Sequence, residues 1–245
     1  MSRSWRGFVV LAVLVAAVCV RLGVWQLDRL AERRATNARA LAAREAPEVR
    51  LGPGGLGAEL DGRRVSVTGE FDRAVEVVIR GQSWDGGPGV RVVTPLRLEG
   101  SDTVVLVDRG FVKAPDAVHA DLAGLDEPGR HTVRGLAFAL ERRADGGQPL
   151  ERDGSVTWRG LDRDALRERL PFPLAAVWVL ESPDSTLPPW PRRMAAPALD
   201  DGPHLSYAIQ WFGFALIGLV GAAVVAFRAR RAAQAFTAEA QRTQR

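Results

Sequence analysis

Cysteine is nearly absent from this sequence, and its scarcity excludes several kinds of chemistry. The single residue, Cys19, leaves no partner for a disulfide within the chain and excludes metal sites built from cysteines. The two methionines are too few for a copper-carrying methionine cluster. Lysine is also scarce, with Lys113 the only one, so the net charge of +4 rests on arginines interleaved with carboxylates. No basic stripe with interleaved aromatics exists, which argues against nucleic-acid binding.

Recognisable catalytic motifs are missing as well. The sequence contains no G-x-S-x-G nucleophile elbow, no phosphate-binding glycine loop and no H-E-x-x-H zinc motif. His119 lies between Asp116 and Asp121 in KAPDAVHADLAG, where a solvated loop explains it better than a metal site. His131 follows a Pro-Gly turn and is expected at an exposed strand edge. We therefore predict a protein without enzymatic activity.

Two long apolar runs are present instead. Residues 7–27 and residues 205–227 each hold about 20 residues, enough to cross a hydrocarbon layer about 30 Å thick. A cleaved signal peptide is an alternative for the first run, because Arg3 and Arg6 precede it, but no A-x-A site follows. A lipoprotein anchor is disfavoured by Val18, where a small residue should precede the cysteine. We predict two transmembrane helices.

Arginines near the ends of these runs predict the orientation in the membrane. Five of them flank the runs on the sides away from the central segment: Arg3, Arg6, Arg228, Arg230 and Arg231. Because such residues accumulate on the cytoplasmic side, residues 1–6 and 228–245 are predicted to be cytoplasmic. Residues 28–204 would then form an extracytoplasmic domain of a multi-pass protein in the cell membrane.

The central segment has the pattern of a β-rich domain. After a helical extension of the first run over 31–44, six short runs favour strands: 63–71, 75–80, 90–98, 103–112, 131–140 and 174–180. One short helix is predicted in LDRDALRERL, with Asp162 as its N-cap. Residues 183–203 carry six prolines and are expected to form a stiff return linker to the membrane. The predicted fold class is an α+β membrane protein whose two transmembrane helices flank an antiparallel sheet or small barrel with one or two helices.

Two details inside this domain attract attention. The glycine-rich segment GQSWDGGPG is typical of a hairpin, with Gly86, Gly87 and Gly89 expected to supply positive φ. Arg109 follows Asp108 at the end of a predicted strand. The sequence alone leaves two interpretations of Arg109 open, a buried ion pair or a contact with a partner protein.

The second apolar run begins with an unusual group of side chains. His204, Tyr207, Gln210 and Trp211 occupy its first two turns. On a helical wheel five residues fall within about 80° of one another and so share one face: His204, Tyr207, Trp211, Phe214 and Gly218. This face is either an ordinary aromatic anchor at the membrane interface or a binding site.

Three separated blocks carry a resemblance to a known family. They are LGVWQLDRLAERR at the end of the first run, GPGVRVVTPL followed by VLVDRGFV in the middle, and HLSYAIQWF at the start of the second run. In this order and spacing they resemble the Surfeit locus protein 1 family, membrane assembly factors of haem–copper cytochrome c oxidase. The resemblance covers about residues 10–230. The chain departs from the usual pattern at Phe111 and Lys113, and in the DDGP that precedes His204.

The resemblance implies a function and a ligand. The function is assembly of cytochrome c oxidase, in which the protein assists haem a insertion or stabilises the haem-loaded catalytic subunit. The implied partners are that subunit, other oxidase assembly factors and the lipid bilayer. Transient haem a is the only cofactor implied, with the histidine of the H-x-x-Y-A motif, here His204, as the ligand of its iron. A neutral imidazole suits haem iron, and aromatic side chains such as Tyr207 and Trp211 suit the macrocycle.

The same hypothesis extends to the first span. Arg21, Trp25, Asp28 and Glu32 follow at helical spacing and form one face. We expect the Arg21–Trp25 face to pack toward His204 and close a pocket, with Arg21 or Arg29 placed to pair a propionate. An alternative function remains, a membrane-anchored scaffold or sensor whose outer β domain binds a protein partner.

Overall fold

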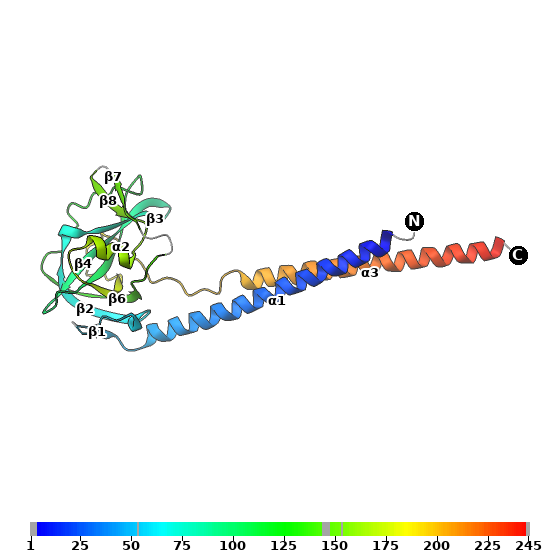
Figure 1. The fold of residues 1–245 in the computed structure, drawn as a ribbon, viewed down its shortest axis with the longest axis horizontal. Helices are drawn as coiled ribbons and strands as arrows, with labels where there is room; N and C mark the ends of the chain where they lie inside the picture. Colours follow the sequence, from blue (N-terminus) through cyan, green and yellow to red (C-terminus); the bar gives the residue numbers. More distant parts are fainter. Residues whose placement is uncertain (1–3, 53, 144–147, 153, 244–245) are drawn as a thin grey trace. The chain divides into compact units, whose positions relative to one another are not determined.

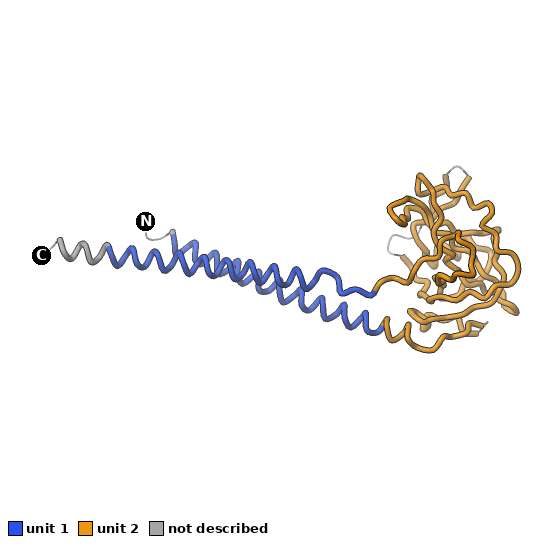
Figure 2. The backbone as a smooth tube through the Cα atoms, turned by 180° about the vertical axis from the view of Figure 1, so that it is seen from behind, with its two compact units in different colours: residues 1–39, 199–245 blue, residues 40–198 orange. Residues whose placement is uncertain are grey.

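The chain divides into two units, coloured separately in Figure 2. A computed structural model describes residues 4–52, 54–143, 148–152 and 154–243. Residues 1–39 and 199–245 form the first unit, and residues 40–198 form the second. The helical unit holds both apolar runs and the β-rich unit holds the central segment, in agreement with the predicted fold class.

Two long helices make up the first unit. They are α1, Ser4–Glu45, and α3, His204–Thr243. Both contain stretches long and apolar enough to cross a membrane. As expected, α1 does not stop where the apolar run ends, because strong helix formers continue it until Pro47. The two helices lie side by side (Figure 1).

Small residues line the surface between the two helices. The buried positions recur at steps of three, four or seven residues: Ala16, Cys19, Gly23 and Leu30 in α1, and Ala208, Ala215 and Ala222 in α3. This is the spacing of a left-handed helix pair, and small side chains let the two backbones approach closely. We call this surface the helix seam. At Gly23, a Cβ would lie 2.7 Å from the Phe212 ring.

A Gly23→Leu substitution should therefore separate the helices. Overpacking a close contact costs about 1–3 kcal/mol. Cys19 and Ala215 belong to one buried cluster, so oxidation of an Ala215→Cys variant should join Cys19 to the new cysteine. Adding Gly23→Leu should reduce this cross-link several-fold. Gly221→Leu is the matched control, since a Cβ there meets nothing within 4 Å. If both substitutions reduced the yield of the cross-link equally, Gly23 would not be a close contact between the helices.

The described residues of the second unit form nine strands. They are β1 Val49–Leu51, β2 Arg64–Phe71, β3 Val77–Trp84, β4 Gly87–Leu98, β5 Val104–Lys113, β6 Arg130–Ala139, β7 Leu150–Arg152, β8 Ser155–Trp158 and β9 Leu174–Glu181. Short 3₁₀ turns lie at Ala58–Leu60 (η1) and Arg73–Val75 (η2), and α2 spans Arg163–Arg169. All six predicted strands are present, and the Asp162 side chain caps α2 by accepting from two backbone N–H groups. The sequence analysis missed β1, β7 and β8.

Five of the strands close into a barrel. The pairing runs β2-β6-β9-β5-β4, and β4 returns to β2 through three residue pairs that begin at Gly69 and Leu98. Val65 and Val67 point into the fully buried core, whereas a Cβ at Gly69 would overlap the Arg97 carbonyl. Glycine thus permits the close backbone approach that closes the barrel. Of the two predicted alternatives, the small barrel is confirmed.

Two local expectations were wrong. Within GQSWDGGPG the positive φ angles belong to Gly81, Asp85 and Gly86, and neither Gly87 nor Gly89 has one. Gly89 is required for another reason, because a Cβ there would overlap Val112 and the Phe111 ring. His131 pairs with Gly69 of β2, and the pairing of β6 with β9 begins only at Gly135, so His131 lies at an open strand edge as expected, although it is half-buried rather than exposed.

Residues 183–203 are irregular, as their prolines predict, but they are anchored to the barrel. Phe111 and Arg192 exchange two backbone hydrogen bonds, of 2.9 and 2.8 Å, and so form a β-bridge. The neighbouring Gly110 has φ +116°, and a Cβ there would overlap the Arg192 carbonyl. The return linker therefore leaves the barrel from a fixed point on β5.

A Gly110→Ala substitution should loosen this anchor. It combines a strained left-handed φ with a backbone clash, so we expect a drop in the unfolding midpoint of the full chain and faster proteolysis within residues 183–203. Gly100→Ala is the matched control, because Gly100 also has positive φ but open space around it. Equal effects of the two substitutions on the linker would show that the clash with Arg192 has no role.

Candidate functional site

The N-terminal end of α3 is held by a local turn and by a contact with α1. Gly202 has φ +67° and donates its N–H to the Asp200 carboxylate at 2.9 Å. The Pro203 carbonyl accepts from the Tyr207 N–H at 3.1 Å and from the Ser206 hydroxyl at 2.8 Å. This turn fixes the backbone at His204, the first residue of α3.

The His204 ring is hydrogen bonded across the helix seam. Its Nδ1 lies 2.8 Å from Oε1 of Gln26, a partly buried residue of α1. Nε2 has no hydrogen-bond partner among the described residues. Gly202 lies beside this nitrogen, since a Cβ there would stand 3.7 Å from it, at ordinary van der Waals distance. One ring nitrogen is occupied and the other is open to a ligand.

Aromatic side chains continue from His204 along the same face of α3. Trp211 is partly buried against the helix seam and meets Phe214 edge-on, with ring centroids 5.9 Å apart. Phe214 is 56% exposed and Tyr207 is 47% exposed. The face therefore runs from Trp211 at the seam to the exposed rings of Tyr207 and Phe214. Its residues fit a planar aromatic ligand bound through an imidazole nitrogen.

Arg21 and Trp25 do not lie on the surface that contacts α3. Both are exposed, Trp25 by 41%, and the residues of α1 that meet the start of α3 are Gly23 and Gln26. The expected packing of the Arg21–Trp25 face against His204 is wrong, because small side chains permit closer helix approach than arginine and tryptophan do. Whether Arg21 and Trp25 bind a ligand stays a prediction.

Arg29 also lies outside the seam. Its guanidinium stacks over the Trp25 ring at 5.8 Å and donates to Glu32 at 2.6 Å. Both groups of that ion pair are at least half exposed, so the pair contributes little to stability. A propionate would have to compete with Glu32 for this arginine.

Further polar contacts join α1 to the segment just before α3. The Asp200 carbonyl accepts from Asn37 at 2.7 Å and from Arg33 at 3.1 Å, and Arg34 pairs with Asp201 at 2.8 Å. All of them lie beyond Gln26 along α1. They add to the Gln26 contact in fixing where the second helix begins.

A second polar centre is buried in the barrel unit. Arg109, from β5, is fully buried, and its guanidinium donates to Glu127 at 2.7 Å, to Glu76 at 3.2 Å and to the Leu125 carbonyl at 2.5 Å. Its other face lies over the Phe71 ring at 5.1 Å. Of the two interpretations of Arg109, the buried ion pair is therefore the one observed, with partners other than the adjacent Asp108.

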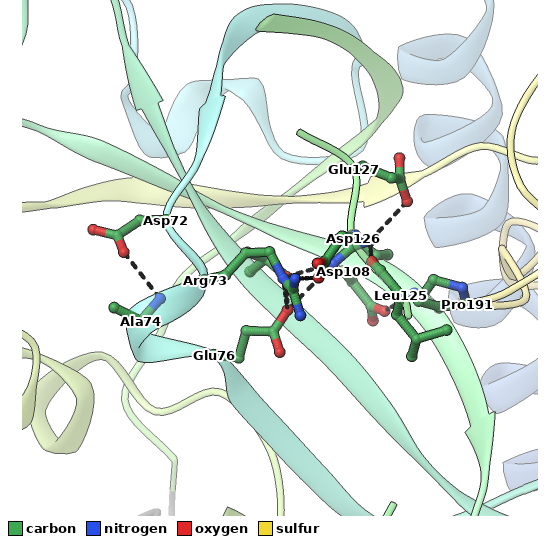
Figure 3. A network of polar contacts seen from close by, with 12 residues as sticks. Asp72, Arg73, Ala74, Glu76, Asp108, Leu125, Asp126, Glu127 and Pro191 are labelled. Carbon is green, nitrogen blue, oxygen red and sulfur yellow. Dashed lines mark hydrogen bonds and ion pairs between the residues drawn. The ribbon is translucent and has the colours of Figure 1, made fainter. Parts of the chain in front are cut away.

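The return linker enters the same centre through Arg193. This buried residue donates to Glu127 at 2.6 Å and to Glu181 at 2.8 Å, so Glu127 holds two arginines at once. Figure 3 shows the neighbouring part of this network, where Arg73 reaches Glu76 and Asp126. We call Arg109, Arg193, Glu76, Glu127 and Glu181 the buried ionic network.

The carboxylates of the β-rich unit differ in their titration. Burial alone would raise the pKa of Glu127, but hydrogen bonds from Arg109 and Arg193 outweigh it and lower this pKa. Burial raises the pKa of Glu181 more than Arg193 lowers it. Asp108 pairs with Arg91 at 2.8 Å, and burial raises its pKa too. Because Arg193 comes from the return linker and Glu127 and Glu181 from the barrel unit, the network holds the linker to the barrel.

His119 and Asp116 form a local pair on a loop. Their side chains lie 2.6 Å apart, and hydrogen bonds from the His119 and Val118 backbone N–H groups and from the His119 ring lower the pKa of Asp116. Within the described part of the chain, no group of three or more His, Cys, Asp or Glu residues has the arrangement of a metal site. The pair stabilises the turn after β5.

Sequence reasoning missed Gln26, Gly202, Glu127 and Arg193. Gln26 stood in the quoted block LGVWQLDRL, but the face was assigned from its charged and aromatic residues. The three- and four-residue spacing of Ala16, Cys19, Gly23 and Gln26 was the signal that could have found it. No comparable signal exists for Glu127 and Arg193, which are 66 residues apart and lie outside any periodic element.

Comparisons with known proteins agree with this architecture. The SURF1 family model matches residues 13–216. An uncharacterised SURF1-like protein of Mycobacterium tuberculosis is 27% identical over 237 residues, covering 92% of this chain and 86% of its own length. SURF1-like proteins of Rickettsia felis (26% identical, 84% and 91% covered) and of Monosiga brevicollis (27%, 84% and 82%) are also similar. The matched region includes most of α1, the whole barrel and the His204 end of α3, so the chain belongs to the SURF1 family.

Proposed function

We propose that this chain is an assembly factor for haem–copper cytochrome c oxidase and acts without catalysing a reaction. In this proposal it receives haem a through His204 and either passes it to the catalytic subunit or stabilises that subunit once loaded. The observation that carries the proposal is the His204 ring, which has one nitrogen bound to Gln26 and the other open beside an exposed aromatic face. Membership of the SURF1 family supports it.

In this proposal, each residue of the candidate site would contact a different part of the haem. His204 would supply the nitrogen ligand to the iron, and Tyr207 and Trp211 would contact the macrocycle. Trp25 and Arg21 are exposed on α1 away from the surface that contacts α3, so the ligand would have to extend past the helix seam to reach them; the guanidinium would then be available to a carboxylate. Because Tyr207 is exposed rather than enclosed by α1, the bound group would remain accessible to a partner protein. Such access suits a carrier that must release its cargo.

Purification of the full chain in mild detergent, from cells that make haem a, tests this function. We expect haem a, identified by its pyridine haemochrome, and the oxidase catalytic subunit to copurify. The alternative function, a scaffold or sensor whose β domain binds another protein, predicts a different partner and no haem. Recovery of an unrelated partner without haem a or oxidase subunits would favour that alternative.

We further propose that both termini face the cytoplasm and that the barrel lies outside the cell membrane. The support is the cluster Arg228, Arg230 and Arg231 that follows the apolar part of α3. A phosphatase reporter that works only outside the cytoplasm should be active when inserted within residues 115–125 and inactive when fused after Arg231. The reverse pattern would contradict this orientation.

A further inference from the structure

One contact of His204 comes from a residue with no role in the function proposed above. Gln26 lies in α1, 178 positions earlier in the sequence, and its amide is the only described hydrogen-bond partner of the imidazole. It sits among the seam residues, three positions after Gly23, and is partly buried. The backbone of α1 and the closeness of α3 therefore restrict where the amide can lie.

The identity of the contacting atoms determines the protonation of the ring. A neutral imidazole carries a proton on one nitrogen and a lone pair on the other. The Gln26 atom facing Nδ1 is the carbonyl oxygen, which can only accept, so Nδ1 must donate. The lone pair is then on Nε2, the nitrogen beside Gly202 that has no described partner. This is the tautomer that an iron ligand requires.

We propose that Gln26 is a positioning residue for His204: it holds the ring by Nδ1–H and so presents the Nε2 lone pair to a haem iron. The inference rests on the proposed function, in which His204 is the ligand. Beyond that function, we infer that the His204 ring is oriented by a residue of α1. Tight binding of haem would therefore require that α1 and α3 pair correctly. Partners of this kind typically change metal affinity about 10–100-fold when removed.

The alternative is that the amide only joins two helices. Interhelical hydrogen bonds in membranes usually contribute little to helix association, and such a role would not depend on which atom faces the imidazole. The two roles predict different properties of the bound iron. A stronger acceptor at Nδ1–H raises the basicity of the ligand and strengthens the bond between iron and Nε2. A helix contact alone leaves that bond unchanged.

The experiment uses the full-length chain in detergent, titrated with hemin as the probe, for wild type, Gln26→Leu, Gln26→Glu and His204→Ala. We expect Gln26→Leu to weaken hemin binding about 10–100-fold and Gln26→Glu to restore it. In resonance Raman spectra of the reduced complexes, the iron–histidine stretch should shift down in Gln26→Leu and up in Gln26→Glu. The cross-link between Cys19 and Ala215→Cys reports helix pairing in each variant.

The experiment distinguishes a failure of the proposed His204 ligation from a failure of the proposed Gln26 positioning. If His204→Ala binds hemin as wild type does, the proposed ligand is wrong, and the role of Gln26 falls with it. If His204→Ala loses hemin while both Gln26 variants keep the wild-type affinity and iron–histidine frequency, ligation stands and positioning is overturned. Loss of affinity in Gln26→Leu with no frequency shift in either variant would also overturn positioning, because it assigns Gln26 to helix packing alone.

Discussion

A His204→Ala variant should accumulate in the membrane as wild type does and yet carry almost no haem a when purified from cells that make it. The substitution removes Nε2 of His204, the ring nitrogen beside Gly202 that has no hydrogen-bond partner among the described residues. It leaves the seam residues Ala16, Cys19 and Ala215 in place, so the helix pair should form normally. In the proposed function His204 would supply the only nitrogen that the described residues of the candidate site offer to the iron, so its removal should abolish binding.

The measurement is the ratio of haem a to protein, with the membrane level of the protein as the internal check. Ser206→Ala is the matched control, because Ser206 lies on the same turn and the described contact of its hydroxyl is with the Pro203 carbonyl. It should keep the wild-type ratio. Equal haem content in His204→Ala and wild type would exclude His204 as the ligand.

The largest effect on stability should come from Glu127→Gln. The carboxylate accepts from Arg109 and Arg193, both buried, and the amide is of similar size but uncharged. Removing one partner of a buried ion pair typically costs about 3–5 kcal/mol, and we expect a loss near the lower end because Arg109 keeps Glu76 and Arg193 keeps Glu181. Glu99→Gln is the control, since Glu99 pairs with Arg130 at a site where both side chains are more than half exposed, and should change little.

If the loss of stability in Glu127→Gln is electrostatic, it should depend on pH. The pKa of Glu127 is lowered in the folded protein from its ordinary 4.5. Its contribution to stability is therefore complete well above pH 4.5 and is lost as the pH falls through the folded value. The quantity to measure is the difference in free energy of unfolding between wild type and Glu127→Gln, obtained by chemical unfolding of the full chain in detergent. This difference should be constant near pH 7 and should become smaller below pH 4.5. A difference independent of pH would indicate a purely steric effect.

The fold was largely predictable because its main strands have strong local patterns. Alternating valines marked β2, and the Asp162 cap marked α2. The strands β1, β7 and β8 have three or four residues each, too few for alternation to show. Barrel closure depends on Gly69 and on pairing between β2 and β4, a relation that no local pattern contains.

The candidate site was predictable in part for a different reason. His204, Tyr207 and Trp211 stand out on one helix face, and the structure keeps them together. The partner face on α1 was assigned wrongly because Arg21 and Trp25 are conspicuous, whereas Gly23 contributes only the absence of a side chain. Which residues two helices bring together depends on how closely their backbones approach, and small residues decide that distance.

The central claim is that the chain supports assembly of a haem a-containing oxidase, and the reduced-minus-oxidised spectrum of membranes tests it most directly. The comparison is between wild-type cells, cells lacking the gene, and deleted cells that carry it on a plasmid. The account predicts a severe loss of the haem a band on deletion, with the haem b bands retained, and recovery of the haem a band with the plasmid. An unchanged haem a band in deleted membranes, or parallel loss of haem a and haem b, would contradict it.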